Sequence, residues 1–217
     1  MKMRLIKKLI SITSALVILS TTISSAEVLV PGGIDSLYND DGPGFATEIV
    51  VAGDSYAQRF YEDERDRGIN LIGYFNAGFT LDMNWSTLLE AFNSLNKIIF
   101  FSVSINDRHK NTHPSEFERE FRTLLDIADR TGKIVFVHSY MYYDLASVPI
   151  FSYTTSEYDA MIRKIVQEYK NVYYIDMSDC IGSEYMQEDG LHYNKKFNDI
   201  MFDRMNFLID LLKSGVL

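Results

Sequence analysis

Short apolar runs that alternate with longer amphipathic stretches constrain the fold of this sequence more than any other feature. The apolar runs cover residues 49–52, 69–75, 97–103, 133–138 and 172–175. They lack the polar–apolar alternation of half-buried strands, so they predict strands buried on both faces. Amphipathic stretches over residues 56–65, 85–95, 115–130, 156–169 and 195–213 predict the helices. Strict alternation of strands and helices predicts a three-layer α/β fold around a parallel sheet.

The N-terminus has the pattern of a secretory signal peptide. Basic residues at positions 2, 4, 7 and 8 precede a mostly apolar stretch over residues 9–23, and small residues up to Ala26 suit cleavage by a signal peptidase. A retained membrane anchor is the alternative, but a span needs roughly 20 apolar residues. We therefore expect residues 1–26 to be removed and the protein to be secreted, with no stable membrane insertion afterwards.

The rest of the chain is expected to hold one domain. Residues 27–47 are dense in glycine, proline, asparagine and aspartate and predict an irregular leader, and the domain is expected over residues 48–217. The formal net charge is −9 and becomes more negative without the basic signal segment, which makes nucleic acid a poor partner. Cys180, the single cysteine, cannot form an internal disulfide and is expected to be a small buried side chain.

A candidate nucleophile directly follows the first predicted strand. In the run Gly53-Asp54-Ser55, the glycine permits a tight exit from the strand and the serine places a hydroxyl at its carboxyl end. Ligands of parallel sheets bind beyond the carboxyl ends of the strands. Taken alone, the tripeptide is more typical of a turn in which Ser55 caps the next helix than of a nucleophile.

A candidate base and its acceptor follow the fifth predicted strand, in the run Asp189-Gly190-Leu191-His192. A serine nucleophile needs a base within hydrogen-bond reach, and the base needs an acceptor for its other ring nitrogen. An isolated Asp-x-x-His also fits a surface loop with an exposed histidine. Since both motifs follow strands of one predicted sheet, we interpret Ser55, His192 and Asp189 as a catalytic set.

Two further segments offer hydrogen-bond donors. The side-chain amide of Asn106 follows the third predicted strand, where an Asn-Asp turn is the simpler explanation. The backbone near Gly78, after the second strand, can approach a substrate closely because glycine has no side chain. Acyl transfer needs such donors to stabilise the oxyanion of its tetrahedral intermediate.

In these motifs and their order, the sequence resembles the SGNH hydrolase superfamily of GDSL-type esterases and lipases. The matching segments are residues 53–55, 76–78, 104–107 and 189–192, and the resemblance extends from residue 49 to the C-terminus. It implies a flavodoxin-like α/β/α sandwich with a five-stranded parallel sheet, and ester hydrolysis without a metal or organic cofactor. It further implies catalytic roles for Ser55, Asp189 and His192 and oxyanion contacts from Gly78 and Asn106.

The sequence departs from the family pattern at three positions. Tyr56 stands where the family has leucine, a change with no expected chemical effect. Ser104 replaces the glycine before Asn106 and is expected to tighten the local backbone without removing the amide. An alternative alignment places Leu81 rather than Gly78 at the second oxyanion position.

Other polar and aromatic residues have simpler explanations. His109 and His113 lie near Asp107, but Pro114 and the polar run over residues 108–112 predict a loop, so we expect no metal site. His138 ends the fourth predicted strand and is expected to be a satisfied core or rim histidine. Tyrosines 140, 142 and 143 follow it and offer aromatic faces for stacking on sugar rings, although packing is the commoner role.

The expected function is therefore that of an exported serine esterase. An O-acyl group on a carbohydrate is the favoured substrate, and lipid esters, short-chain esters and acyl transfer to a sugar remain open. A non-catalytic glycan-binding protein with the same fold is the rival from another class. The sequence leaves the oligomeric state open.

Overall fold

Five parallel strands form one sheet in the order β2-β1-β3-β4-β5. The computed structural model describes residues 48–138, 154–180 and 182–217. The strands are β1 (Ile49–Gly53), β2 (Leu71–Phe75), β3 (Ile98–Ser102), β4 (Ile134–His138) and β5 (Val172–Ile175). All five predicted strands are present, with ends that differ from the predicted ones by up to two residues.

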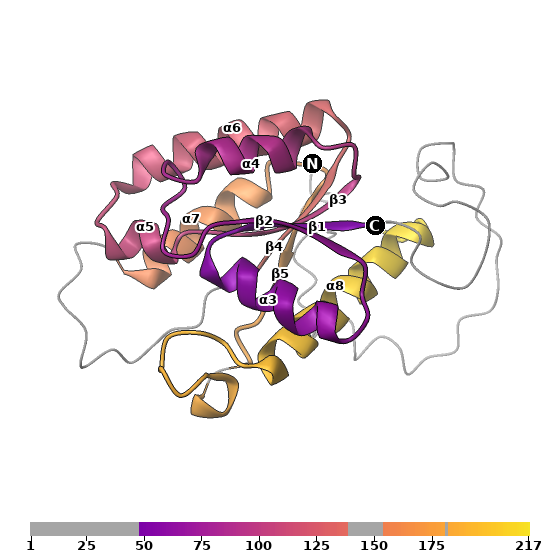
Figure 1. Cartoon of the computed structure of the whole chain (residues 1–217). Helices are drawn as coiled ribbons and strands as arrows, with labels where there is room; N and C mark the ends of the chain where they lie inside the picture. Colours follow the sequence, from indigo (N-terminus) through magenta and orange to yellow (C-terminus); the bar gives the residue numbers. More distant parts are fainter. Residues whose placement is uncertain (1–47, 139–153, 181) are drawn as a thin grey trace.

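Helices cover both faces of the sheet. They are α3 (Ser55–Asp66), α4 (Trp85–Asn93), α5 (Ile105–His109), α6 (Pro114–Arg130), α7 (Thr155–Val166) and α8 (Lys195–Lys213), with a 3₁₀ turn, η2 (Ser183–Tyr185). Figure 1 shows α4, α6 and α7 on one face and α3 and α8 on the other. The predicted three-layer α/β/α sandwich with a five-stranded parallel sheet is thereby confirmed.

The central strand β3 explains why the sequence reads as continuous apolar runs. Successive side chains of a strand point to opposite faces of the sheet. Phe100 therefore stacks on Phe60 of α3 with ring centroids 4.2 Å apart, while Phe101 lies 5.4 Å from Phe121 of α6. Because helices lie on both sides, every position of β3 must be apolar or hydrogen-bonded.

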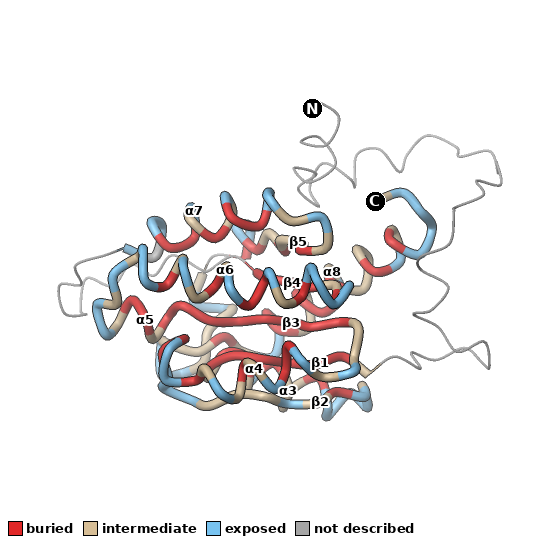
Figure 2. Tube along the Cα trace, turned by 90° about the horizontal axis from the view of Figure 1, so that it is seen from above, coloured by how far each residue is buried: buried red, intermediate tan, exposed pale blue. Residues whose placement is uncertain are grey.

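The expectation of burial on both faces is right for β1 and β3 and wrong for β2. Every residue of β1 and β3 is buried, whereas β2 has one buried residue and exposes Gly73 (Figure 2). The cause is position, because β2 is an edge strand and its outer side has no neighbouring strand. An apolar run alone does not distinguish a central strand from an edge strand.

One local prediction near α6 is wrong in part. Residues 105–109 form the short helix α5, which includes the start of the run over residues 108–112 that indicated a loop. The N-cap of α6 is His113, whose Nδ1 accepts a hydrogen bond from the Ser115 N–H at 3.2 Å. Pro114 takes the first helical position, where its missing N–H costs no hydrogen bond.

Several sequence-based predictions fall outside the described residues. They include the signal peptide over residues 1–26, the leader over residues 27–47 and tyrosines 140, 142 and 143. Among the residues that are described, no helix has the length and apolar character to cross a membrane. Cys180 is buried, as expected.

Candidate active site

Ser55 and Asn106 lie where the order of the strands in the sheet reverses. The chain leaves β1 toward β2 on one side and later returns to β3 on the other, so the switch point lies between β1 and β3. Ser55 follows β1 and Asn106 follows β3, at the carboxyl ends of these adjacent strands. Such a switch point opens a crevice in which doubly wound sheets bind ligands.

Gly53 allows β1 and β3 to approach closely at this point. Its φ is +146°, and a Cβ atom there would lie 1.8 Å from the Ser102 carbonyl oxygen. The same carbonyl accepts a hydrogen bond from the Asp54 N–H at 3.0 Å. No other amino acid fits this position without moving the backbone that carries Ser55.

Ser55 is the first residue of α3, and Asp54 is its N-cap. The Asp54 side chain accepts a hydrogen bond from the Tyr56 N–H at 3.0 Å. The alternative that Ser55 itself caps the helix is therefore wrong. Since the first N–H groups of a helix have no intrahelical acceptor, the Ser55 N–H is available to a ligand.

Asp189 orients His192 through three hydrogen bonds. Its Oδ2 lies 2.7 Å from His192 Nδ1, and its Oδ1 accepts the backbone N–H groups of Leu191 and His192, both at 2.9 Å. Partial desolvation opposes ionisation of Asp189, but the hydrogen bonds from His192 and Leu191 outweigh it and lower its pKa to about 2. Asp189 thus holds a negative charge against Nδ1 and leaves Nε2 directed elsewhere.

Tyr56 connects the nucleophile helix to the histidine loop. Its hydroxyl donates to the Leu191 carbonyl at 2.7 Å, and its ring centroid lies 5.5 Å from that of His192. The side chain that replaces the family's leucine therefore has a positioning role, which the sequence analysis did not foresee. A leucine cannot form this hydrogen bond.

Asn106 presents an unused donor. Its Nδ2 is buried and has no hydrogen-bond partner among the described residues. A buried donor without a partner costs roughly 1–3 kcal/mol, so such groups are rare unless a ligand or water satisfies them. This unsatisfied amide is what an oxyanion donor requires in the absence of substrate.

The structure separates the two candidates for the second backbone donor. The Leu81 N–H donates to both oxygens of Asp107, at 3.2 and 3.1 Å, and Leu81 is fully buried. Gly78 is exposed, and its N–H has no acceptor among the described residues. The hydrogen bonding of the two N–H groups therefore favours Gly78 over Leu81 as the candidate for the second backbone donor.

A pocket of about 340 Å³ joins these groups. Its wall consists of Ser55, Gln58, Arg59, Ala77, Gly78, Asn106, Leu191 and His192. Ser55, Gly78, Asn106 and His192 thus come together as predicted, with Asp189 behind His192. No hydrogen bond joins Ser55 and His192 within the described structure, and such contacts are often long before substrate binds.

Asn84 is a supporting residue that the sequence analysis missed. It is buried, its Nδ2 donates to the Gly53 carbonyl at 2.5 Å, and its Oδ1 accepts from Asn76 Nδ2 at 2.6 Å. It therefore connects the backbone before Ser55 to the loop that carries Gly78. Its partners are distant in sequence, so no local pattern marked it.

Two buried carboxyl groups lie behind the site. Burial raises the pKa of Asp54 to about 8, with a further contribution from nearby Asp107. Burial likewise raises the pKa of Asp107 to about 7, against the hydrogen bond from Leu81. Asp54 Oδ2 has no partner among the described residues, which agrees with a neutral group at pH 7.

These raised pKa values predict a pH-dependent stability. The folded state holds the Asp54 and Asp107 protons more tightly than the unfolded state, so the free energy of unfolding falls as pH rises from about 4 to about 8. Asp107→Asn should make this slope shallower by up to about 1.4 kcal/mol per pH unit between pH 5 and 7. Urea unfolding at several pH values measures it, and equal slopes in both proteins would contradict the assignment.

Ser104 has a backbone conformation that normally requires glycine. Its φ is +109°, and such positions cost a non-glycine residue about 1–3 kcal/mol. Ser104→Gly should therefore raise the free energy of unfolding by about 1 kcal/mol, after allowing for the greater freedom of glycine in the unfolded chain. Ser94→Gly, at a φ of −60°, is the control and should lower it. A loss of stability in Ser104→Gly would show that the strain is absent.

The remaining histidines are satisfied structurally. His138 Nε2 lies 2.8 Å from Ser102 Oγ in the core, which confirms the expectation for this residue. His109 Nε2 lies 2.7 Å from the Arg108 guanidinium, and His113 caps α6. The described ranges contain no group of three His, Cys, Asp or Glu side chains arranged to hold a metal ion.

The fold, with polar residues at its switch point, is similar to that of solved esterases and lipases. The psychrotrophic esterase EstA from a Pseudoalteromonas species is 17% identical, with a TM-score of 0.57, over 76% of this chain and 97% of that one. A GDSL-like lipase from Bacteroides thetaiotaomicron is 14% identical, with a TM-score of 0.58, over 79% and 89%. A family 3 carbohydrate esterase from Clostridium thermocellum is 18% identical, with a TM-score of 0.55, over 76% and 98%.

Comparison by sequence finds no such relatives. No protein-family model matches this chain, and no curated protein matches it. The solved structures confirm the fold that the four short motifs implied, at identities too low to carry residue roles with them.

Proposed function

We propose that this protein is an exported serine esterase with Ser55 as nucleophile, His192 as general base and Asp189 as its orienting carboxylate. One observation carries the proposal. Ser55, His192, Gly78 and the unpartnered amide of Asn106 line one pocket, although they come from four separate segments of the chain. If Ser55 only formed a turn and His192 only lay in an exposed loop, nothing would require the two residues to line the same pocket.

The proton transfers follow from the orientation of His192. Asp189 occupies Nδ1, so Nε2 accepts the Ser55 proton as Oγ attacks the ester carbonyl carbon. The imidazolium then gives this proton to the departing alcohol, and an acyl-enzyme is left on Ser55. Water attacks next, loses its proton to His192, and releases the acid as Ser55 recovers its proton.

The oxyanion is held by three donors of different origin. The N–H of Ser55 comes from the start of α3, the N–H of Gly78 from the loop after β2, and Nδ2 of Asn106 from α5. All three residues line the pocket. Donors fixed before the reaction stabilise the developing charge without reorganisation, which is how such sites lower the barrier.

The favoured substrate is an O-acyl group, such as acetyl, on a carbohydrate. Support comes from the secretory pattern of residues 1–26 and from the carbohydrate esterase among the structures with this fold. A panel of acetylated glycans and acyl-chain lengths, with a sugar acceptor in one arm, distinguishes this substrate from lipid or short-chain esters and hydrolysis from acyl transfer.

Covalent labelling tests the proposed chemistry directly. The purified protein should hydrolyse 4-nitrophenyl acetate and react with a fluorophosphonate, and peptide mass spectrometry should locate the adduct on Ser55. Prior denaturation should prevent the reaction, because the base and donors then separate. Neither turnover nor labelling would favour the rival interpretation, a glycan-binding protein without catalysis.

A further inference from the structure

The charge of the pocket wall differs from that of the whole chain. The chain carries 30 Asp and Glu against 21 Lys and Arg. Among the described residues, no Asp or Glu lines the pocket. Arg59 is the one Lys or Arg residue in the described part of its wall. A guanidinium at this place interacts more strongly with an anionic group of a substrate than with a neutral one.

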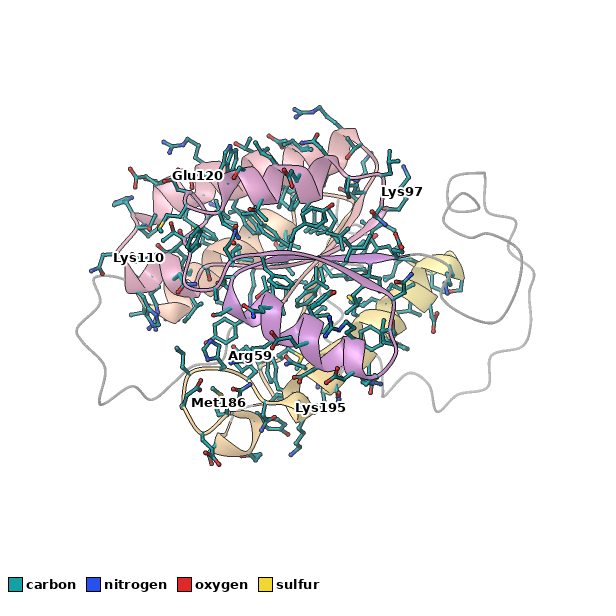
Figure 3. All side chains as sticks on the ribbon, viewed as in Figure 1. Arg59, Lys97, Lys110, Glu120, Met186 and Lys195 are labelled. Carbon is teal, nitrogen blue, oxygen red and sulfur yellow. The ribbon has the colours of Figure 1, made fainter. Side chains whose placement is uncertain are left out.

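Arg59 lies on the same face of α3 as the nucleophile. Positions four apart on a helix are neighbours on its surface, so Ser55 and Arg59 point to one side. Figure 3 shows Arg59 on α3, at the end of the sheet to which α5 brings Asn106. A group bound by Arg59 is therefore held near the reacting ester.

The ion pair that Arg59 makes is weak enough to yield to a ligand. Its Nη1 lies 3.2 Å from Glu62 Oε2, and the two side chains are 45% and 40% exposed. Ion pairs this exposed contribute only about 0–1 kcal/mol. Glu62 also accepts a hydrogen bond from Gln58 Nε2 at 2.8 Å, so it steadies two residues of the pocket wall.

A second cation contacts another residue of the pocket wall, Gly78. Lys110, which directly follows α5 (Figure 3), donates from Nζ to the Gly78 carbonyl at 3.0 Å. Gly78 itself lines the pocket. The wall thus has a positive charge on α3 and another beside Gly78, and each can attract an anionic group of a ligand.

We propose that this pocket selects esters that carry a carboxylate close to the ester bond, and that Arg59 binds this carboxylate. A guanidinium matches a carboxylate with two parallel hydrogen bonds. One arginine in the wall suits a single negative charge better than the double charge of a phosphate monoester. The proposal rests on the esterase function above and names its substrate class.

Two matched ester pairs test this preference. In the first, 4-acetoxybenzoate has its carboxylate on the alcohol part, and methyl 4-acetoxybenzoate is the neutral partner. In the second, mono-4-nitrophenyl adipate has it on the acyl part, and methyl 4-nitrophenyl adipate is neutral. The quantity compared is the ratio of kcat/KM for the charged ester to that for the neutral one, measured for wild type, Arg59→Gln, Arg59→Lys and Arg65→Gln.

Arg59→Gln should lower this ratio about tenfold, as expected for the loss of a charge-assisted hydrogen bond. Arg59→Lys should retain part of the preference for the charged ester. Arg65→Gln is the matched control, since Arg65 is an exposed arginine of the same helix outside the pocket, and should leave the ratio unchanged. The pair that responds identifies the side of the ester that bears the carboxylate. An unchanged ratio in Arg59→Gln for both pairs would overturn the proposal.

Binding to Ser55→Ala separates this proposal from the esterase function. NMR titration with 4-acetoxybenzoate should show saturable chemical-shift changes. The Kd obtained from them should rise about tenfold when Arg59→Gln is combined with Ser55→Ala. Turnover without any effect of Arg59 would leave the esterase and remove the proposed selectivity. Arg59-dependent binding without turnover in wild type would remove the esterase function and keep the selectivity. If neither turnover nor Arg59-dependent binding were seen, both proposals would fail.

Discussion

Ser55→Ala is expected to lower kcat for 4-nitrophenyl acetate by about 10⁴-fold or more, because no other group in the pocket replaces the attacking oxygen. The free energy of unfolding should change by no more than about 0.5 kcal/mol, since Ser55 is only half-buried and its hydroxyl has no partner among the described residues. Steady-state kinetics and urea unfolding measure the two quantities. Equal rates for wild type and Ser55→Ala would reject this nucleophile.

Asp189→Asn provides the companion result. An amide at this position favours the wrong tautomer of His192, so kcat should fall by about 10⁴-fold although the ring stays in place. A serine that reacted without its base would be insensitive to this change. Loss of activity in Ser55→Ala with full activity in Asp189→Asn would keep the nucleophile and reject the proposed triad.

The sequence was sufficient for the fold because its evidence is local. Each strand is a short apolar run that meets helices on both faces, as Phe100 and Phe101 of β3 illustrate by packing on opposite layers. Strand order is different, since nothing in residues 71–75 reveals that β2 is an edge. That property depends on pairing with β1 across the sheet.

The sequence predicts the part of the candidate site that consists of reactive side chains in recognisable motifs. Ser55, Asp189, His192 and Asn106 were singled out because ester hydrolysis would need these residue types after particular strands, and three of them line one pocket. The supporting groups were missed because their partners are remote, as with Tyr56 and the Leu191 carbonyl. Arg59 was overlooked although its spacing of four from Ser55 placed it on the same helical face.

The choice between Gly78 and Leu81 also needed three dimensions. Both align with the family pattern, and both offer a backbone N–H. Only the burial of Leu81 and its hydrogen bonds to Asp107 show that its N–H is already engaged. Asp107 was read from the sequence as part of a turn, whereas it fixes the loop that carries Gly78.

Two asparagines allow the catalytic and structural uses of one amide to be separated. Asn106 Nδ2 has no partner within the described structure, while Asn84 Nδ2 donates to the Gly53 carbonyl and Asn84 Oδ1 accepts from Asn76. Truncation of Asn106 removes a donor that the protein itself does not use. Truncation of the buried Asn84 side chain removes two hydrogen bonds, each of which contributes about 0.5–1.5 kcal/mol. The Gly53 carbonyl keeps the Asn76 N–H as a partner, and Asn76 Nδ2 keeps Thr87 Oγ1.

Asn106→Ala should therefore lower kcat by about 10²- to 10³-fold, as the loss of one oxyanion donor does, with the free energy of unfolding unchanged or slightly raised. Asn84→Ala should lower the free energy of unfolding by about 1–3 kcal/mol. Kinetics and urea unfolding of both variants make the comparison. If Asn106→Ala lost stability as Asn84→Ala does while kcat stayed constant, Asn106 would be a structural residue and the oxyanion site would lie elsewhere.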